Sequence, residues 1–234
     1  MNASLSTLRR AGFVCLFLSV ATLGATTSTF AGIIEAFSPA PVASGPGLGT
    51  VLVPPFFTLS PNNDNVPDLN RPDNNIFVPL KRFDHVGYID IEFFVTPSDG
   101  VTEYQVFESV DNNTGVPWSS YRMELGYGTG AQFQPSQPGD GLDFDFPHYD
   151  LPATSSRLPT IVVRPDEDTL IFNGAQHLSG AETYRFRIDV PDVPTAQFFS
   201  RFTIRQIPIA VPEPASLMLV GIALAGLAVR RTRS

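Results

Sequence analysis

The sequence predicts an all-β protein: an antiparallel β-sandwich of jelly-roll or immunoglobulin-like kind, with an N-terminal signal peptide and a C-terminal transmembrane helix. Three observations lead to this prediction. The 234 residues include 22 prolines, which interrupt helices, and 19 phenylalanines, which favour strands. Apolar and polar residues alternate in about seven or eight short segments between residues 76 and 207, as in strands with one buried face. Each end of the chain adds an uncharged apolar run next to arginines.

Residues 1–31 have the parts of a secretory signal peptide. These parts are a positive start (Arg9, Arg10), an apolar core (residues 11–25) and a small-x-small cleavage site, Thr29-Phe30-Ala31, before Gly32. The expected partners are the Sec translocon and signal peptidase, which would cut between Ala31 and Gly32. A retained N-terminal anchor is the alternative, and in both cases the middle of the chain is exported.

Residues 32–75 are expected to form a lead-in rich in proline and asparagine. One apolar run within it, Thr50–Leu59, is a possible edge strand, because Pro54 and Pro55 lack the N–H groups that a central strand needs.

Residues 76–207 are expected to form the sandwich domain. Val86–Val95 places Ile89, Ile91, Phe93 and Val95 on one face, and Val101–Val110 does the same with Tyr104, Val106 and Val110. The turn Pro97–Gly100 between these two runs predicts a hairpin. Further strands are expected at 120–127, 160–164, 169–172, 182–190 and 197–207. Trp118, the only tryptophan, is expected to anchor the core; a sugar-stacking platform is the alternative.

The C-terminal residues predict a membrane-spanning segment with a defined orientation. A linker at 208–214 precedes the uncharged run 215–229, which would be about 22 Å long as a helix, short for a bilayer core of about 30 Å. Residues 230–234 form a basic tail containing Arg230, Arg231 and Arg233. Basic residues that flank a span stay in the cytoplasm, so the sandwich domain is expected outside.

The linker contains Val211-Pro212-Glu213-Pro214. Together with the apolar run and the basic tail, it resembles the PEP-CTERM sorting signal of Gram-negative bacteria. The resemblance implies that an exosortase, a membrane-embedded cysteine transpeptidase-like enzyme, recognises and cleaves this site. The protein would be anchored transiently in the inner membrane and then reach the cell surface or be released. Such proteins typically occur in bacteria that make exopolysaccharide and biofilm.

Residues 102–126 also resemble a segment of uncharacterised PEP-CTERM β-proteins, which implies no particular activity.

The net charge of the exported part restricts which partners it can bind. Between residues 32 and 214 the chain carries all 23 acidic side chains and ten basic ones, a formal charge of −13. Nucleic acid and anionic lipid are repelled by such a surface. The one cysteine, Cys15, lies in the signal segment, so no disulfide or thiolate chemistry is expected in the exported part.

The loop that follows the strand at 120–127 supplies the one candidate metal site. Its acidic residues are Asp140, Asp143, Asp145 and Asp150. Calcium takes six to eight oxygen ligands, often from such loops, but the EF-hand spacing is absent. An ordinary turn-rich loop packed on the core is the alternative, and no cofactor is expected.

Other catalytic patterns are absent or weak. His85, His148 and His177 lack zinc-site spacing, and there is no G-x-S-x-G motif. Two pairs of carboxylates are candidates for the catalytic pair of a glycosidase. They are Glu103 with Glu108 and Glu124 with Asp143.

The sequence therefore predicts an exported, non-enzymatic protein of the cell surface or extracellular matrix, with a structural, adhesive or exopolysaccharide-associated role. The alternative is an exported hydrolase of matrix polysaccharide or peptide. A glycan-binding module predicts aromatic side chains on an exposed sheet face. A glycosidase predicts two carboxylates about 5 to 10 Å apart in a cleft.

Overall fold

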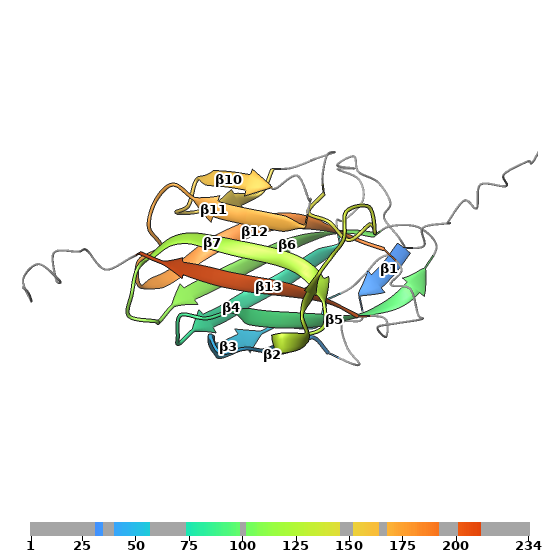
Figure 1. The fold of residues 1–234 in the computed structure, drawn as a ribbon, viewed down its shortest axis with the longest axis horizontal. Helices are drawn as coiled ribbons and strands as arrows, with labels where there is room; N and C mark the ends of the chain where they lie inside the picture. Colours follow the sequence, from blue (N-terminus) through green and yellow to red (C-terminus); the bar gives the residue numbers. More distant parts are fainter. Residues whose placement is uncertain are drawn as a thin grey trace, which may run out of the picture.

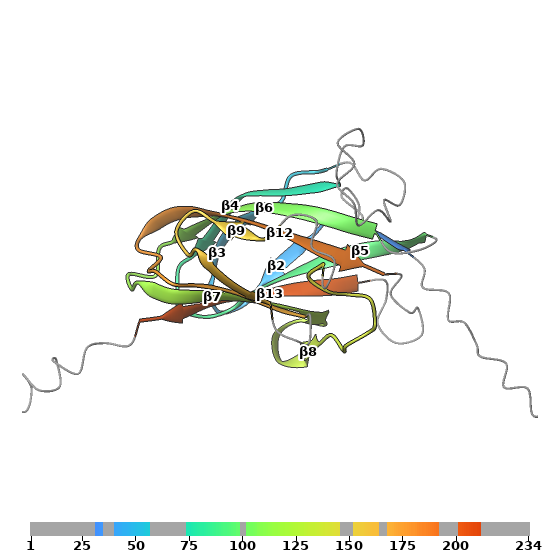
Figure 2. The ribbon, with the colours of Figure 1, turned by 90° about the horizontal axis from the view of Figure 1, so that it is seen from above.

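Two β-sheets pack face to face in the computed structural model (Figures 1 and 2). The structure describes residues 31–34, 40–56, 74–98, 102–145, 152–163, 168–191 and 201–211. Within these ranges the one helical element is the 3₁₀ turn η1 (Gly130–Gln132). None of the described residues forms a helix able to cross a bilayer, and the span predicted at 215–229 lies outside them.

The larger sheet has eight described strands, all paired antiparallel. Its central path runs β1-β5-β13-β7-β11-β10, while β2 pairs with β5 and β8 with β7. The strands are β1 (Ala31–Ile34), β2 (Val42–Ser44), β5 (Ile89–Ser98), β7 (Trp118–Tyr127), β8 (Gln134–Pro135), β10 (Thr160–Val163), β11 (Thr169–Asn173) and β13 (Arg201–Ala210). The last strand of the described chain, β13, thus lies in the middle of this sheet.

The smaller sheet has five described strands in the order β3-β4-β6-β12-β9. They are β3 (Leu48–Leu52), β4 (Asn75–Phe83), β6 (Thr102–Asn112), β9 (Thr154–Ser155) and β12 (Gly180–Val190). The pairs are antiparallel except for β4 and β6, which run parallel. The all-β prediction is confirmed for the described residues, with this one departure from antiparallel pairing.

The predicted hairpin between residues 86–95 and 101–110 is wrong. Both segments are strands, but β5 belongs to the larger sheet and β6 to the smaller one. The chain therefore crosses from one layer to the other between Ser98 and Thr102 instead of folding back within a layer (Figure 2). Alternation of apolar residues predicts that a segment is a strand and which face is buried, but it does not select the neighbouring strand.

Two predicted boundaries also shift. The lead-in at 32–75 contributes most of β1, all of β2 and β3 and the start of β4, and β3 ends before Pro54 and Pro55. At the other end, β13 continues through residues 208–210, which the sequence had suggested to be linker. These residues keep pairing with β7 as far as Ala210 opposite Trp118.

The core lies between the sheets and follows the predicted alternation. Ile89, Ile91, Phe93 and Val95 of β5 are buried, and so are their counterparts on the other long strands. These counterparts are Tyr104, Val106, Val110, Tyr121, Met123, Leu125, Tyr184, Phe186, Ile188, Val190, Phe202 and Ile204. Trp118 is fully buried and packs edge-on against Phe83, with ring centroids 5.1 Å apart. Its role as a core anchor is confirmed.

Candidate functional site

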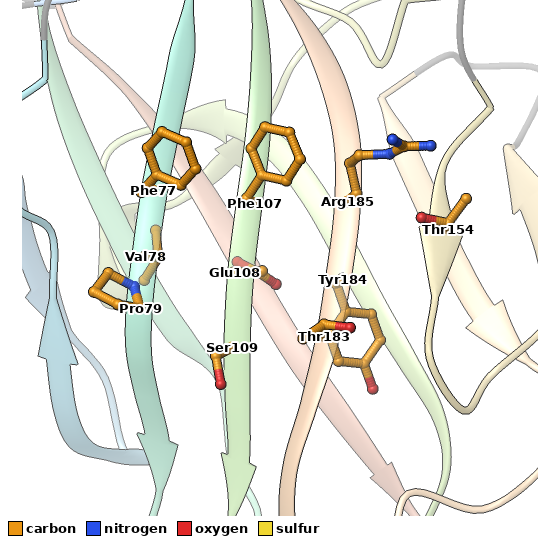
Figure 3. A pocket seen from close by; sticks show the side chains of 10 residues that line it. All are labelled: Phe77, Val78, Pro79, Phe107, Glu108, Ser109, Thr154, Thr183, Tyr184 and Arg185. Carbon is orange, nitrogen blue, oxygen red and sulfur yellow. The ribbon is translucent and has the colours of Figure 1, made fainter.

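A groove lies on the outer face of the smaller sheet, away from the core (Figure 3). Its volume is about 280 Å³. The lining residues come from β4, β6, β12 and β9: Phe77, Val78, Pro79, Phe107, Glu108, Ser109, Thr154, Thr183, Tyr184 and Arg185. The groove is therefore built across four neighbouring strands of this sheet.

Strand register brings four of these residues into one row. The parallel pairing of β4 and β6 sets Phe77 beside Phe107, and the antiparallel pairing of β6 and β12 sets Phe107 beside Arg185. Arg185 in turn lies opposite Thr154 of β9. Figure 3 shows these four side chains on the viewer's side of the sheet.

The two phenylalanines form a stacked pair in which Phe77 is exposed and Phe107 is partly exposed. Their ring centroids are 5.2 Å apart and the ring planes differ by 12°. Phe77 is 51% exposed, although phenylalanine is a residue type that folding usually buries. Two nearly parallel rings on a sheet face present an apolar surface with a polar rim, which suits a ligand that has a flat apolar face.

Polar groups flank this surface. Ser109 and Thr183 are opposite each other on β6 and β12, one row away from the aromatic pair. No ion pair joins Arg185 to another described residue, and its Nε has no hydrogen-bond partner among them. The groove thus combines an aromatic platform with hydroxyl groups and a guanidinium group, which can hydrogen-bond to a polar ligand.

Acidic groups in the groove do not form a catalytic pair. Among the described lining residues Glu108 is the one acidic side chain, and its carboxylate points through the sheet to Lys81 in the core. Glu103 lies on the opposite face of β6 and forms a buried ion pair with Arg187. Glu124 pairs with Arg122 on the larger sheet. None of these carboxylates faces another across the groove.

In the loop predicted to bind calcium, the Asp140 carboxylate accepts hydrogen bonds from neighbouring protein groups. Asp140 accepts hydrogen bonds from the Ser136 hydroxyl, from the Leu142 backbone N–H at 3.0 Å and from the Tyr127 hydroxyl at 3.2 Å. Asp143 forms a backbone bridge with Asp189. Asp145 is buried, and Asp150 lies outside the described residues. The described part of the chain contains no group of three His, Cys, Asp or Glu side chains able to hold a metal ion.

The three histidines are not brought together by the described fold. His85 is exposed, His177 is buried beside Tyr184 with 2.9 Å between Nδ1 and the hydroxyl, and His148 lies outside the described residues.

The predicted signal-peptide cleavage bond lies within β1. Ala31 and Gly32 pair with Ser98 and Pro97 of β5. The Tyr104 hydroxyl accepts a hydrogen bond from the Ile34 N–H at 2.8 Å, so the first described strand is held against β6 as well. Cleavage there would leave Gly32 as the first residue of a strand that is already part of the sheet.

The predicted sorting residues begin at the last residue that the structure describes. Val211 is the last described residue, and its N–H donates to the Pro117 carbonyl at 2.9 Å. Pro212, Glu213, Pro214, Arg230, Arg231 and Arg233 lie outside the described residues.

Comparison with known proteins identifies the C-terminal segment. The family model described as the PEP-CTERM protein-sorting motif matches residues 210–233. The chain therefore carries a PEP-CTERM sorting signal, as its C-terminal residues predict, and this supports an exported protein that an exosortase sorts. No curated protein and no solved structure matches the chain.

Sequence reasoning missed the groove, although a signal for it was present. In β6 the buried residues Tyr104, Val106 and Val110 occupy every second position, and Phe107 falls in the opposite phase, among polar residues. A large aromatic side chain on the polar phase of a strand points away from the core.

Proposed function

We propose that this protein is a non-enzymatic, exopolysaccharide-binding protein of the cell surface or extracellular matrix, and that the groove of Phe77 and Phe107 is its binding site. The observation that supports this proposal is the stacked pair of rings on a sheet face, of which Phe77 is exposed and Phe107 partly exposed. The sorting motif at 210–233 supports delivery to the compartment where such polymers occur.

The chemistry of sugars matches the groove. A pyranose ring has a face of C–H groups that stacks on an aromatic ring, and an edge of hydroxyl groups that needs hydrogen-bond partners. Phe77 and Phe107 supply the flat surface, while Thr154, Thr183 and Arg185 supply polar groups beside it. An open groove on a rigid sheet accepts a polymer without requiring a chain end.

Delivery would follow the route that the ends of the chain predict. The signal peptide directs export through the Sec translocon, and the segment 215–229 holds the chain in the inner membrane with Arg230, Arg231 and Arg233 inside. Exosortase then cleaves near Pro212-Glu213-Pro214. Mass spectrometry of the chain from each cell fraction tests this route, and a mature protein that still ends at Ser234 contradicts it.

Substitution of the platform tests the binding site. Full-length Phe77→Ala and Phe107→Ala variants are compared with the unsubstituted chain by affinity electrophoresis in gels containing alginate, xanthan or cellulose derivatives. We expect at least one polymer to retard the unsubstituted chain, and loss of one stacking ring to weaken that binding by about tenfold. Leu80→Ala is the matched control, because Leu80 is an exposed apolar residue of the same strand outside the groove lining.

Two results would refute this assignment. One is equal retardation of the Phe77→Ala, Phe107→Ala and Leu80→Ala chains. The other is release of reducing ends from any of these polymers, which would favour the alternative, an exported hydrolase.

A further inference from the structure

Four polar side chains meet in the core between the two sheets. Lys81 comes from β4, Glu108 from β6, Tyr121 from β7 and Gln206 from β13. Lys81 and Tyr121 are 0% exposed, Gln206 1% and Glu108 3%. Burial of an amine and a carboxylate in an apolar core costs desolvation free energy. Apolar side chains would fill the same space without that cost, so packing alone does not account for this cluster.

A β-bulge in β4 puts Lys81 inside. The register of β4 against β6 shifts between Val78 and Lys81, so Pro79 and Leu80 both point outward. Without the extra residue the alternation that buries Ile76 and Val78 would turn Lys81 to the solvent. The fold therefore places this amine in the core through a specific irregularity.

The contacts among the four side chains are those of an acyl-transfer site. Lys81 Nζ donates hydrogen bonds to Glu108 Oε2 and to Gln206 Oε1. Gln206 Nε2 donates to the same Glu108 oxygen at 3.1 Å. The Tyr121 hydroxyl donates to Gln206 Oε1 at 2.7 Å. An amine thus contacts a carboxamide, a carboxylate touches both nitrogen atoms, and a phenol polarises the carbonyl.

We propose that Lys81 and Gln206 react to form an intramolecular isopeptide bond, with Glu108 as the acid–base catalyst and Tyr121 as the donor that stabilises the oxyanion. The bond would join β4 of the smaller sheet covalently to β13 of the larger sheet. It is independent of the proposed binding of polysaccharide.

The reaction balances without any further reagent. Glu108 takes a proton from the Lys81 ammonium, and the neutral Nζ attacks Cδ of Gln206. The negative charge that develops on Oε1 is stabilised by the Tyr121 hydroxyl. Glu108 then gives a proton to Nε2, the Cδ–Nε2 bond breaks and ammonia leaves. Glu108 takes the remaining excess proton from Nζ, so that a neutral amide and a neutral carboxylic acid remain.

The surroundings favour each step. Burial lowers the pKa of Lys81 from 10.5 to about 8, so the nucleophilic neutral amine is accessible near neutral pH. Burial also raises the pKa of Tyr121 well above its usual value, which keeps the phenol protonated as a donor. Fixed contact between the two reacting groups replaces a bimolecular encounter. The product removes a buried ion pair, whose desolvation is costly.

The bond would connect the two layers at the strand that precedes the sorting motif. β13 ends at Ala210, and the family match starts at that residue. The only cysteine of the chain lies in the signal segment, so no disulfide is available to the exported domain. An isopeptide bond would supply the covalent closure that a disulfide supplies elsewhere.

Intact-mass spectrometry of the full chain under denaturing conditions tests the proposal. After the termini are assigned by peptide mapping, we expect a mass about 17 Da below that of the sequence, which is the loss of one ammonia. Proteolysis should also yield one branched peptide that contains both Lys81 and Gln206. A mass equal to the sequence, or a gain of about 1 Da from simple hydrolysis of the Gln206 amide, would overturn the proposal.

Two substitutions identify the catalyst. Glu108→Gln should restore the full, uncross-linked mass while Lys81 and Gln206 remain. Glu103→Gln is the matched control, because it also removes one partner of a buried ion pair on β6 but lies on the other face of the sheet. The control should keep the deficit of about 17 Da. A deficit that persists in Glu108→Gln refutes the role of Glu108, and the mass of the unsubstituted chain remains decisive if that variant does not fold.

Discussion

Glu103 and Glu108 lie on the same strand, β6, and point to opposite sides of the smaller sheet. Glu108 is five positions after Glu103. Because successive side chains of a strand alternate between its two faces, residues an odd number of positions apart point to opposite sides. Glu103 pairs with Arg187 on one side and Glu108 with Lys81 on the other. The sheet therefore separates two carboxylates that are near each other in sequence, and they cannot flank one glycosidic bond.

The buried Glu103–Arg187 ion pair predicts a large loss of folding stability when Glu103 is replaced by glutamine. Both side chains are 4% exposed. Glu103→Gln removes the negative charge of Glu103 from this buried ion pair, which we expect to lower the free energy of unfolding by about 3 to 5 kcal/mol. Urea denaturation followed by circular dichroism measures this. Glu92→Gln, at the partly exposed pair with Arg201, should cost at most about 1 kcal/mol. Equal losses in the two variants would contradict the assignment of a buried pair.

Trp118 should behave as a core residue and not as part of a sugar site. It is fully buried, stacks with Tyr121 at 5.9 Å and contacts His177 at 4.7 Å between ring centroids. Trp118→Ala should cost about 3 to 5 kcal/mol of stability and leave polysaccharide retardation of the folded fraction unchanged. In the unsubstituted chain this single tryptophan should fluoresce at shorter wavelength when folded than in urea. A solvent-like emission maximum in the folded protein would contradict burial.

His177 predicts a loss of stability in acid. Burial lowers its pKa below the usual value of about 6.5. The folded state therefore holds the neutral ring, whereas the unfolded chain binds a proton as the pH falls below 6.5. Since the unfolded state then binds more protons, stability should fall with decreasing pH in that range. The urea midpoint measured between pH 7.5 and 5 should decline less steeply in His177→Gln. An equal slope in both proteins would exclude His177 as the cause.

The position of β13 predicts opposite outcomes for two truncations. β13 lies between β5 and β7 in the larger sheet and buries Phe202 and Ile204. A chain that ends after Val211 keeps every described strand and should fold with unchanged circular dichroism and protease resistance. A chain that ends after Ser200 loses a central strand and should not fold. If the shorter chain resists protease as well as the longer one, β13 is not required for the sandwich.

Metal removal should have no effect on the described acidic loop. The Asp140 carboxylate already accepts hydrogen bonds from Ser136, Gln137, Leu142 and Tyr127. We therefore expect the same melting temperature in excess chelator and in millimolar calcium. A calcium-dependent rise in the melting temperature, which mass action requires of a bound ion, would reinstate the calcium site.

The sequence by itself determined the sorting signal and most of the strands. The signal is a contiguous run of residues, so its recognition needs no fold, and a family model matches it at 210–233. The buried faces of β5, β7, β12 and β13 followed from period-two alternation, because each strand's own residues record which side meets the core. Trp118 was expected in the core for another reason, because a lone tryptophan in a sandwich usually fills the space between the sheets.

The tertiary structure alone decided which strands are neighbours and what their side chains meet. It separated β5 from β6, set Phe77 beside Phe107 through a parallel pairing, and turned Lys81 inward through a bulge. These outcomes depend on register between segments distant in sequence, and alternation within one segment does not contain that information. The aromatic pair exists because β4 and β6 pair within the smaller sheet, and the buried cluster of Lys81, Glu108 and Gln206 exists because the two sheets pack face to face.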